Sequence, residues 1–160
     1  MEWSLKSVSR SCAACGKVFE AGDDIICMIC RKDSGEFLRC DVLGEKTENF
    51  SAPGRIIGQW KRKFSGKNSD KESLRHVLAS QEEFFFSLYE GDSTREKEIL
   101  KQIFALLLEK KRVLRAAGTD SRGFQRYVHV ASAREFLVPS DDFLPEDLTF
   151  VGNVFEMFVP

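Results

Sequence analysis

The chain has 160 residues, of which 42% are hydrophobic and 31% charged, and its formal net charge is −1. This length and composition suffice for one globular domain, or two small ones, with a buried core. Residues 1–70 carry 12 basic and 10 acidic side chains, and residues 71–160 carry 12 and 15. Neither part is a polyelectrolyte, which argues against binding of nucleic acid over the whole surface.

The first residues, Met1 to Lys6, lack the apolar segment of a signal peptide, and the longest apolar runs are far too short to cross a bilayer. We therefore expect a cytoplasmic protein with no membrane partner. All five cysteines lie in the first quarter of the chain. In the reducing cytosol they are better explained by metal ligation or by simple burial than by disulfides.

The first part of the chain is predicted to be rich in β-structure. Apolar runs and turn residues predict strands over residues 24–31, 37–42 and 55–60, with a turn at 33–36 between the first two. A two-residue turn would place Cys40 opposite Ile29, and a three-residue turn would place it opposite Met28. The choice decides whether Cys40 shares a face of the sheet with Cys27 or with Cys30.

The second part is predicted to be mainly helical. Capping boxes at Ser69, Ser80 and Ser93 predict helices over residues 70–79, 81–90 and 94–111. A hairpin within residues 112–130, a strand over 135–138 and a helix that begins at Pro145 should follow. Three helices followed by a hairpin is the element order of a winged helix that lacks its early strand.

We therefore predict an α+β protein in two domains. Residues 1–65 would form a small β module of the zinc-ribbon or treble-clef kind. Residues 69–160 would form a helical, winged-helix-like module that contains the hairpin. The segment between them is rich in residues that end helices and strands.

The most specific chemical signal is the sequence Cys12-Ala13-Ala14-Cys15-Gly16. Two cysteines separated by two residues and followed by glycine can turn tightly enough to direct both thiolates at one tetrahedral metal ion. Cys27 and Cys30 repeat this spacing, and the whole set matches the ligand spacing of a zinc ribbon. The sequence thus predicts a structural zinc bound by Cys12, Cys15, Cys27 and Cys30.

Two alternatives to this ligand set stay open. Cys27 and Cys30 lie in a predicted strand, where residues three apart point to opposite faces, so they can instead be small buried side chains. In a treble clef the second ligand pair follows the hairpin, near residues 40–46, and there the chain contains Cys40 alone. Cys40 is therefore the alternative ligand.

Three features occur together in the chain: the pattern Arg10-x-Cys12-x2-Cys15-Gly16-x2-Phe19-x2-Gly22, a Gly58-x-Trp60-Lys61 strand, and a hairpin entered through Lys110-Lys111-Arg112. In these features the chain resembles a family of small uncharacterised bacterial proteins, and the resemblance covers most of its length. The resemblance implies a treble-clef-like module, but the second CxxC of that pattern is missing at the expected place. It implies no known activity.

A second signal is the basic segment 55–67, which contains Arg55, Trp60, Lys61, Arg62, Lys63 and Lys67. Such a segment can contact phosphates while an aromatic ring stacks on a base. It can equally be a strand edge guarded by lysines, with Trp60 packed inward. The basic hairpin 112–126 would be the wing of a winged helix.

Catalysis has little support in the sequence, because His76 and His129 lie outside any recognisable nucleophile, phosphate-loop or metalloprotease motif. We expect a non-enzymatic binding or adaptor protein with protein partners, whose β module is held together by zinc. The alternative is a nucleic-acid-binding regulator that uses segment 55–67 and hairpin 112–126.

Overall fold

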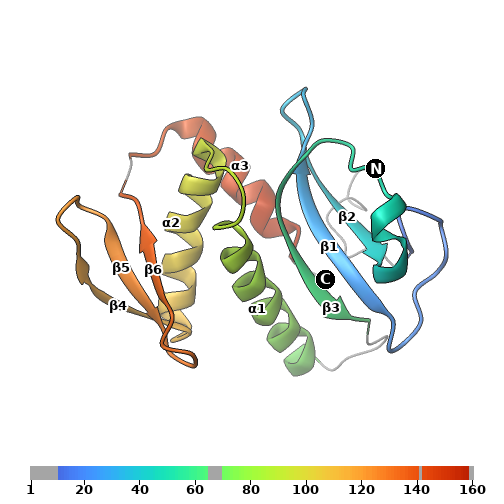
Figure 1. Cartoon of the computed structure of the whole chain (residues 1–160), viewed down its shortest axis with the longest axis horizontal. Helices are drawn as coiled ribbons and strands as arrows, with labels where there is room; N and C mark the ends of the chain where they lie inside the picture. The colour runs from blue at the N-terminus through green and yellow to red at the C-terminus, as the bar shows by residue number, and fades with distance from the viewer. Residues whose placement is uncertain (1–10, 65–69, 141, 159–160) are drawn as a thin grey trace. The chain divides into compact units, whose positions relative to one another are not determined.

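The computed structural model of the chain describes residues 11–64, 70–140 and 142–158. It contains two three-stranded antiparallel sheets and the helices α1 (Asp70–Ser87), α2 (Arg95–Lys110) and α3 (Pro145–Glu156) (Figure 1). The predicted α+β class is confirmed. The chain divides into a first unit of residues 1–87 and 152–160 and a second unit of residues 88–151. Within the described residues, none of the helices has the length and apolar character needed to cross a membrane.

The sheet of the first unit has the strand order β2-β1-β3, with β1 at Asp24–Arg31, β2 at Phe37–Leu43 and β3 at Arg55–Lys63. These strands confirm the three predicted ones, and β3 extends further than expected. The β1–β2 pairing places Cys40 opposite Met28. In the turn between them Gly35 has φ +94°, and its N–H donates to the Lys32 carbonyl at 2.8 Å. The register of the longer turn is therefore the one that forms.

Helix α1 packs on β3 at a position where the strand has no side chain. A Cβ at Gly58 would lie 2.4 Å from Cε1 of Phe84 and 2.8 Å from Oγ of Ser87. Glycine is therefore what allows the helix to approach the strand so closely. The Ser87 hydroxyl also accepts the Gln59 backbone N–H at 3.0 Å.

The aromatic core of the first unit uses residues that are far apart in the chain. Trp60 stacks on Phe158, with ring centres 4.7 Å apart. Phe84 meets both rings edge-on, at 5.8 Å from Trp60 and 5.3 Å from Phe158. These contacts explain why the units differ from the predicted domains 1–65 and 69–160. Helix α1 and the C-terminal residues both belong to the first unit.

Two predictions about helix starts are wrong. The capping box at Ser80 predicts a break, but α1 continues through it from Asp70 to Ser87. The residues around Ser80 are ordinary helix formers, and a capping pattern without Gly or Pro does not end a helix. The cap of α2 is Thr94 and not Ser93, because the Thr94 hydroxyl accepts the Lys97 N–H at 3.3 Å. Two α-helices, rather than the three expected of a winged helix, therefore precede the hairpin in the described chain.

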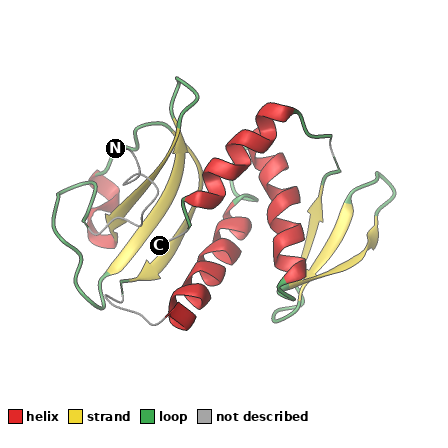
Figure 2. Ribbon diagram, turned by 180° about the vertical axis from the view of Figure 1, so that it is seen from behind, coloured by secondary structure: helices red, strands yellow, loops and turns green. Residues whose placement is uncertain are grey.

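The second unit consists of α2, the start of α3 and a sheet of strand order β4-β5-β6 (Figure 2). Its strands are β4 (Leu114–Thr119), β5 (Gln125–His129) and β6 (Glu135–Val138), which confirms the predicted hairpin and the strand after it. Asp120 closes the hairpin turn, since its carboxylate accepts the N–H groups of Arg122 and Phe124, each at 2.9 Å. Buried residues of the sheet, including Leu114, Tyr127 and Phe136, form its core with α2.

Candidate functional site

The two cysteines of the CxxC sequence form a turn that is held by hydrogen bonds to sulfur. The Sγ of Cys12 accepts the backbone N–H of Ala14 at 3.4 Å and that of Leu43 at 3.3 Å. The Gly16 N–H donates to the Cys12 carbonyl at 2.8 Å, and Gly16 has φ +79°, a conformation that favours glycine. We call residues 12–16 the cysteine knuckle.

The knuckle stabilises a thiolate at Cys12. Cys12 is buried, whereas Cys15 is exposed. Burial opposes ionisation of Cys12, but the N–H groups of Leu43, Cys15 and Ala14 outweigh it and lower the pKa of this thiol. A side-chain hydrogen bond with Cys15 makes a smaller contribution to the lowered pKa of Cys12. Two adjacent sulfur atoms, one of them stabilised as a thiolate, are suited to a thiophilic metal ion.

The other three cysteines lie in the first sheet, Cys27 and Cys30 on β1 and Cys40 on β2. Cys27 and Cys30 are buried on opposite faces of β1. Cys27 lies opposite Asp41 in the β1–β2 register and shares a face with it. Cys40 lies opposite Met28, so it is on the other face, where it hydrogen-bonds to Cys30. Burial, and then the negative charge of Asp41, raise the pKa of Cys27 to about 11. Cys30 and Cys40 are free thiols. A side-chain hydrogen bond between them raises the pKa of Cys30 and lowers that of Cys40.

The four cysteines expected as zinc ligands are therefore not brought together. All five cysteines and both histidines lie in the described ranges. Within these ranges, no group of three or more Cys, His, Asp or Glu side chains is placed to hold a metal ion. The knuckle supplies two cysteine sulfur atoms, and a tetrahedral zinc ion would need two further donors.

A buried ion cluster of Arg39, Asp41 and Arg62 lies on the face of the first sheet that carries Cys27. The Asp41 side chain is 0% exposed and accepts from Nε of Arg39 at 2.8 Å. Nη2 of Arg62 lies 3.9 Å from the other Asp41 carboxylate oxygen. Arg39 also donates to the backbone carbonyl of Met157. Two guanidinium groups thus share one carboxylate in the interior of the unit.

The aromatic residue of the basic segment 55–67 is part of the core. Trp60 is 3% exposed, stacks on Phe158 and has the Arg39 guanidinium 5.0 Å from its ring centre. Its ring is therefore covered by this chain's own side chains and is not presented to a base. The reading of this segment as a packed strand agrees with these contacts.

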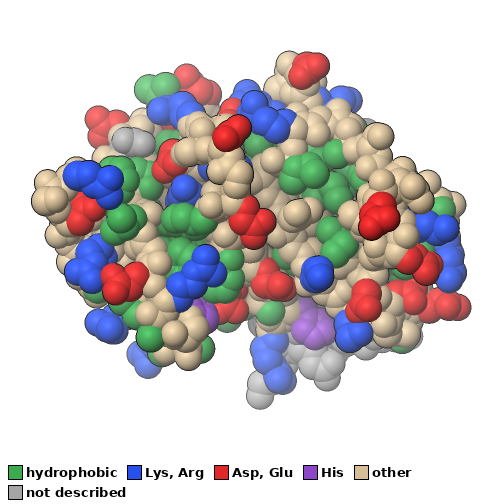
Figure 3. Space-filling model, viewed as in Figure 1, with side chains coloured by type: hydrophobic (Ala, Val, Ile, Leu, Met, Phe, Trp, Pro, Cys, Tyr) green, Lys and Arg blue, Asp and Glu red, His purple; other side chains and the backbone are tan. Residues whose placement is uncertain are grey.

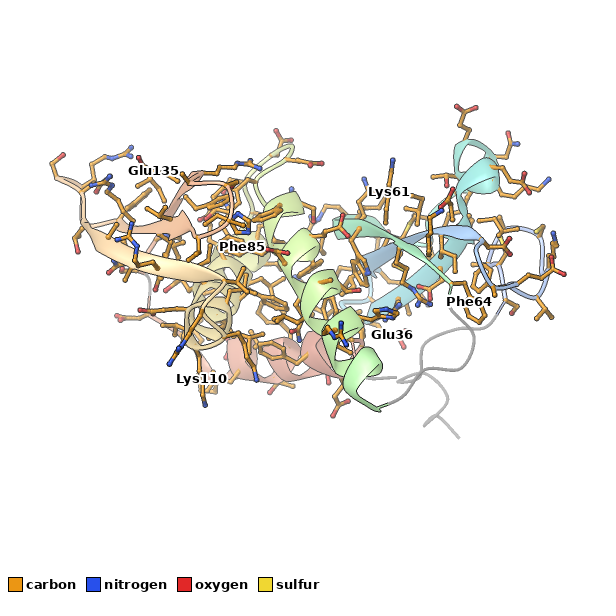
Figure 4. The ribbon with its side chains drawn as sticks, turned by 90° about the horizontal axis from the view of Figure 1, so that it is seen from below. Glu36, Lys61, Phe64, Phe85, Lys110 and Glu135 are labelled. Atoms are coloured by element: carbon orange, nitrogen blue, oxygen red, sulfur yellow. The ribbon has the colours of Figure 1, made fainter. Side chains whose placement is uncertain are left out.

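The basic side chains of the same segment have several different environments. Arg62 belongs to the buried ion cluster, and Lys63 pairs with Asp24 at 2.8 Å. Arg55 and Lys61 are exposed on β3, and Lys61 is labelled in Figure 4. Lys67 lies outside the described residues. On the face shown in Figure 3, Lys and Arg side chains are interspersed with Asp and Glu, so they form no single positive field.

The two histidines lie on different elements, His76 on α1 and His129 at the end of β5. His76 is exposed on α1. His129 has Nδ1 2.8 Å from the Ser132 hydroxyl, in a turn where the Ala133 N–H donates to the His129 carbonyl at 2.7 Å. This His129–Ser132 contact stabilises a local turn.

A second candidate site is formed by large apolar side chains exposed at the start of α3. Phe143 is 37% exposed, Leu144 47% and Leu148 58%. We call these three residues the apolar patch. The neighbouring acidic side chains Asp142 and Glu146 are exposed as well. This patch was not predicted, although three large apolar residues among acidic ones at a helix start were a visible signal.

The apolar patch is held in place by Asp147. The Asp147 carboxylate accepts the Leu144 backbone N–H at 2.7 Å and pairs with Nη2 of Arg95 at 2.6 Å. Pro145 occupies the first position of the helix, where its fixed φ is favourable. The start of α3 is thus tied to the first turn of α2, within the second unit.

Replacing Asp147 with asparagine is expected to lower the melting temperature near neutral pH. The Leu144 N–H and then Arg95 lower the pKa of Asp147 below the ordinary carboxyl value of about 4. A lowered folded-state pKa stabilises the protein above the ordinary value, and this stabilisation is lost as the pH falls through the lowered pKa. The difference between native protein and variant should therefore shrink on acidification. Thermal melts over a pH series test this, and a difference that stays constant would contradict it.

Comparison with known proteins identifies no relative. No protein-family model, no curated protein and no solved structure matches this chain. The family resemblance described from the sequence therefore stays a prediction. Function has to be inferred from the cysteine knuckle and the apolar patch themselves.

Proposed function

We propose that the chain is a non-catalytic adaptor that binds another protein through the apolar patch. The observation that carries this proposal is the exposure of Phe143, Leu144 and Leu148, at 37%, 47% and 58%, within six consecutive residues. Clustered exposed side chains of this size are typical of interaction sites in soluble proteins. Leu144 and Leu148 are four residues apart, so they lie on the same side of the helix start.

The chemistry of the patch suggests the kind of partner. Its rim is acidic, because Asp142 and Glu146 are exposed beside the apolar residues. A complementary surface would carry apolar side chains flanked by Lys or Arg, as an amphipathic basic helix does. The bonds from Asp147 to Leu144 and Arg95 fix the start of α3, so little conformational entropy should be lost on binding.

A protein partner is favoured over a nucleic acid for two reasons. The acidic rim would repel phosphate groups near the patch. The basic segment 55–67, which supports the alternative, has its Trp60 ring buried and Arg62 paired with Asp41. The exposed cations that remain there are few, and phosphate binding depends steeply on their number.

The proposal is tested by quantitative affinity purification from the native cell, followed by measurement of Kd with the purified partner. The double variant Leu144→Ser/Leu148→Ser should weaken partner binding at least about tenfold, because each buried leucine contributes roughly 1.5 to 3 kcal/mol. The matched control is Leu106→Ser, since Leu106 is also exposed, at 55%, but lies on α2 outside the patch. Equal Kd values for both variants would refute the proposal, as would binding that disappears after nuclease treatment.

A further inference from the structure

Exposed basic side chains occur in close succession where α2 ends and β4 begins. They are Lys110, Lys111, Arg112 and Arg115, and we call these residues the basic corner. Lys110 is labelled in Figure 4. No ion pair within the described residues includes any of them. By contrast, Arg122 of the same hairpin pairs with Asp120 at 3.3 Å, and Arg126 pairs with Glu135 at 2.8 Å. The basic corner therefore carries positive charge that the chain itself does not neutralise.

Arg112 has a backbone conformation that usually belongs to glycine. Its φ is +66°. The Arg112 N–H donates to the Glu109 carbonyl and the Val113 N–H to the Leu108 carbonyl, each at 2.9 Å. These two bonds form a Schellman motif, whose left-handed position is most often occupied by glycine. A strained arginine is expected there if its side chain makes a contact that glycine cannot make.

The strand that follows the basic corner has an open edge. β4 is the outermost strand in the order β4-β5-β6 (Figure 1). The Val130 N–H donates to the Val113 carbonyl at 3.0 Å. Because hydrogen bonding alternates along an antiparallel ladder, the N–H and C=O groups of Leu114 and Ala116 point away from β5. Ala116 is exposed, so solvent reaches the edge at this position.

We propose that β4 and the basic corner bind an acidic, extended segment of a partner protein, which adds to the sheet as a further strand. The open edge presents hydrogen-bond donors and acceptors in alternation, as another polypeptide strand does. Phosphate oxygens only accept hydrogen bonds, so a nucleic acid backbone matches this edge less well. The proposal goes beyond the adaptor function, because this surface does not include the apolar patch.

The side chains of β4 define the sequence that would fit. A partner residue opposite Arg115 would lie on the same face of the sheet, so an acidic side chain there would pair with it. The residues on either side would lie on the other face, where Leu114 is buried. Further acidic residues would face Lys110 and Arg112. The expected pattern is therefore one acidic residue between two apolar ones, with more acidic residues around them.

Fluorescence polarisation of the full chain with a labelled heptapeptide tests the proposal. The peptide has two valines separated by one glutamate, with two glutamates at each end. We expect saturable binding, and N-methylation of both valines should weaken it at least about tenfold, because two backbone donors are lost. A peptide with lysine in place of every glutamate should not bind. Failure of the unmodified peptide to bind, or equal binding of the N-methylated peptide or of a single-stranded heptanucleotide, would overturn the proposal.

Two variants with a matched control separate binding from folding. Arg115→Gln should weaken peptide binding about threefold. Arg126→Gln should leave it unchanged, since Arg126 lies on the same face but pairs with Glu135. Arg112→Gly should also weaken binding about threefold, yet raise the melting temperature by about 2 °C, because glycine relieves the strained position.

The same variants show whether the cations only guard an edge strand. In that case Arg115→Gln would make the chain self-associate and leave peptide binding unchanged, which would refute the proposal. The patch variant Leu144→Ser/Leu148→Ser should bind the peptide like the native chain. Failure of the adaptor proposal and failure of this one are therefore distinguishable.

Discussion

Replacing Gly58 with alanine is expected to lower the free energy of unfolding by about 3 kcal/mol, the upper part of the range for overpacked cores. The added Cβ would lie 2.4 Å from Cε1 and 2.8 Å from Cδ1 of Phe84. Phe84 cannot move aside easily, because it is 0% exposed and packs edge-on against Trp60 and Phe158. The helix must therefore shift, and the bond from Gln59 N–H to Ser87 Oγ is then lost.

Chemical denaturation of Gly58→Ala beside Gly152→Ala measures this effect. Gly152 lies in α3, and a Cβ there would meet no atom within 4 Å. Because alanine is the better helix former, Gly152→Ala should leave stability unchanged or raise it by up to about 1 kcal/mol. If both variants unfolded like the native protein, the close approach of α1 to β3 would be disproved.

Removal of the Asp41 carboxylate is expected to destabilise the first unit by about 3 to 5 kcal/mol. Asp41→Ala leaves Arg39 and Arg62 facing each other without the carboxylate between them, in a site where Asp41 is 0% exposed. Buried like charges repel strongly, since the interior screens them less than water does. The decrease in the free energy of unfolding should be larger than the decrease caused by breaking an ordinary surface ion pair.

Asp24 provides a matched control for Asp41. It pairs with Lys63 at the same 2.8 Å that separates Asp41 from Arg39, but its side chain is 75% exposed. Exposed pairs contribute little, so Asp24→Ala should have a small effect. Urea denaturation of both variants makes the comparison without adding salt. Equal losses would show that Asp41 is not buried between the two guanidinium groups.

Most of the strands were predictable because their signals are local. The turn around Gly35 and the apolar run over 24–31 define β1 and β2, and Pro145 marks the start of α3. The course of α1 through Ser80 was not predictable from the capping pattern. That pattern satisfies free N–H groups at a helix start, but inside a helix those groups are already bonded.

Among the cysteines, too, one feature could be predicted from local sequence and another could not. The knuckle follows from Cys12, Cys15 and Gly16 alone, since its hydrogen bonds are mostly local. Which other cysteines lie near it depends on strand register, and a change of one residue in the turn exchanges the face that Cys40 occupies. The observed pairing of Cys40 with Met28 places Cys40 on the face of the sheet that carries Cys30. Register of this kind depends on tertiary packing and cannot be read from spacing.

The burial of Trp60 could not be predicted from the residues near it in the sequence either. Its stacking partner Phe158 lies almost at the other end of the sequence. A basic segment around an aromatic residue looks the same in sequence whether the ring packs inward or faces solvent. The contact that decides between the two is non-local.

The return of the C-terminal residues to the first unit has a consequence for the order of folding. The second unit is one continuous stretch, residues 88–151, so it can form as soon as that stretch has left the ribosome. The first unit must wait for residues 152–158, which bring Phe158 to Trp60 and the Met157 carbonyl to Arg39. The part of the protein that is synthesised first is therefore the part that is completed last.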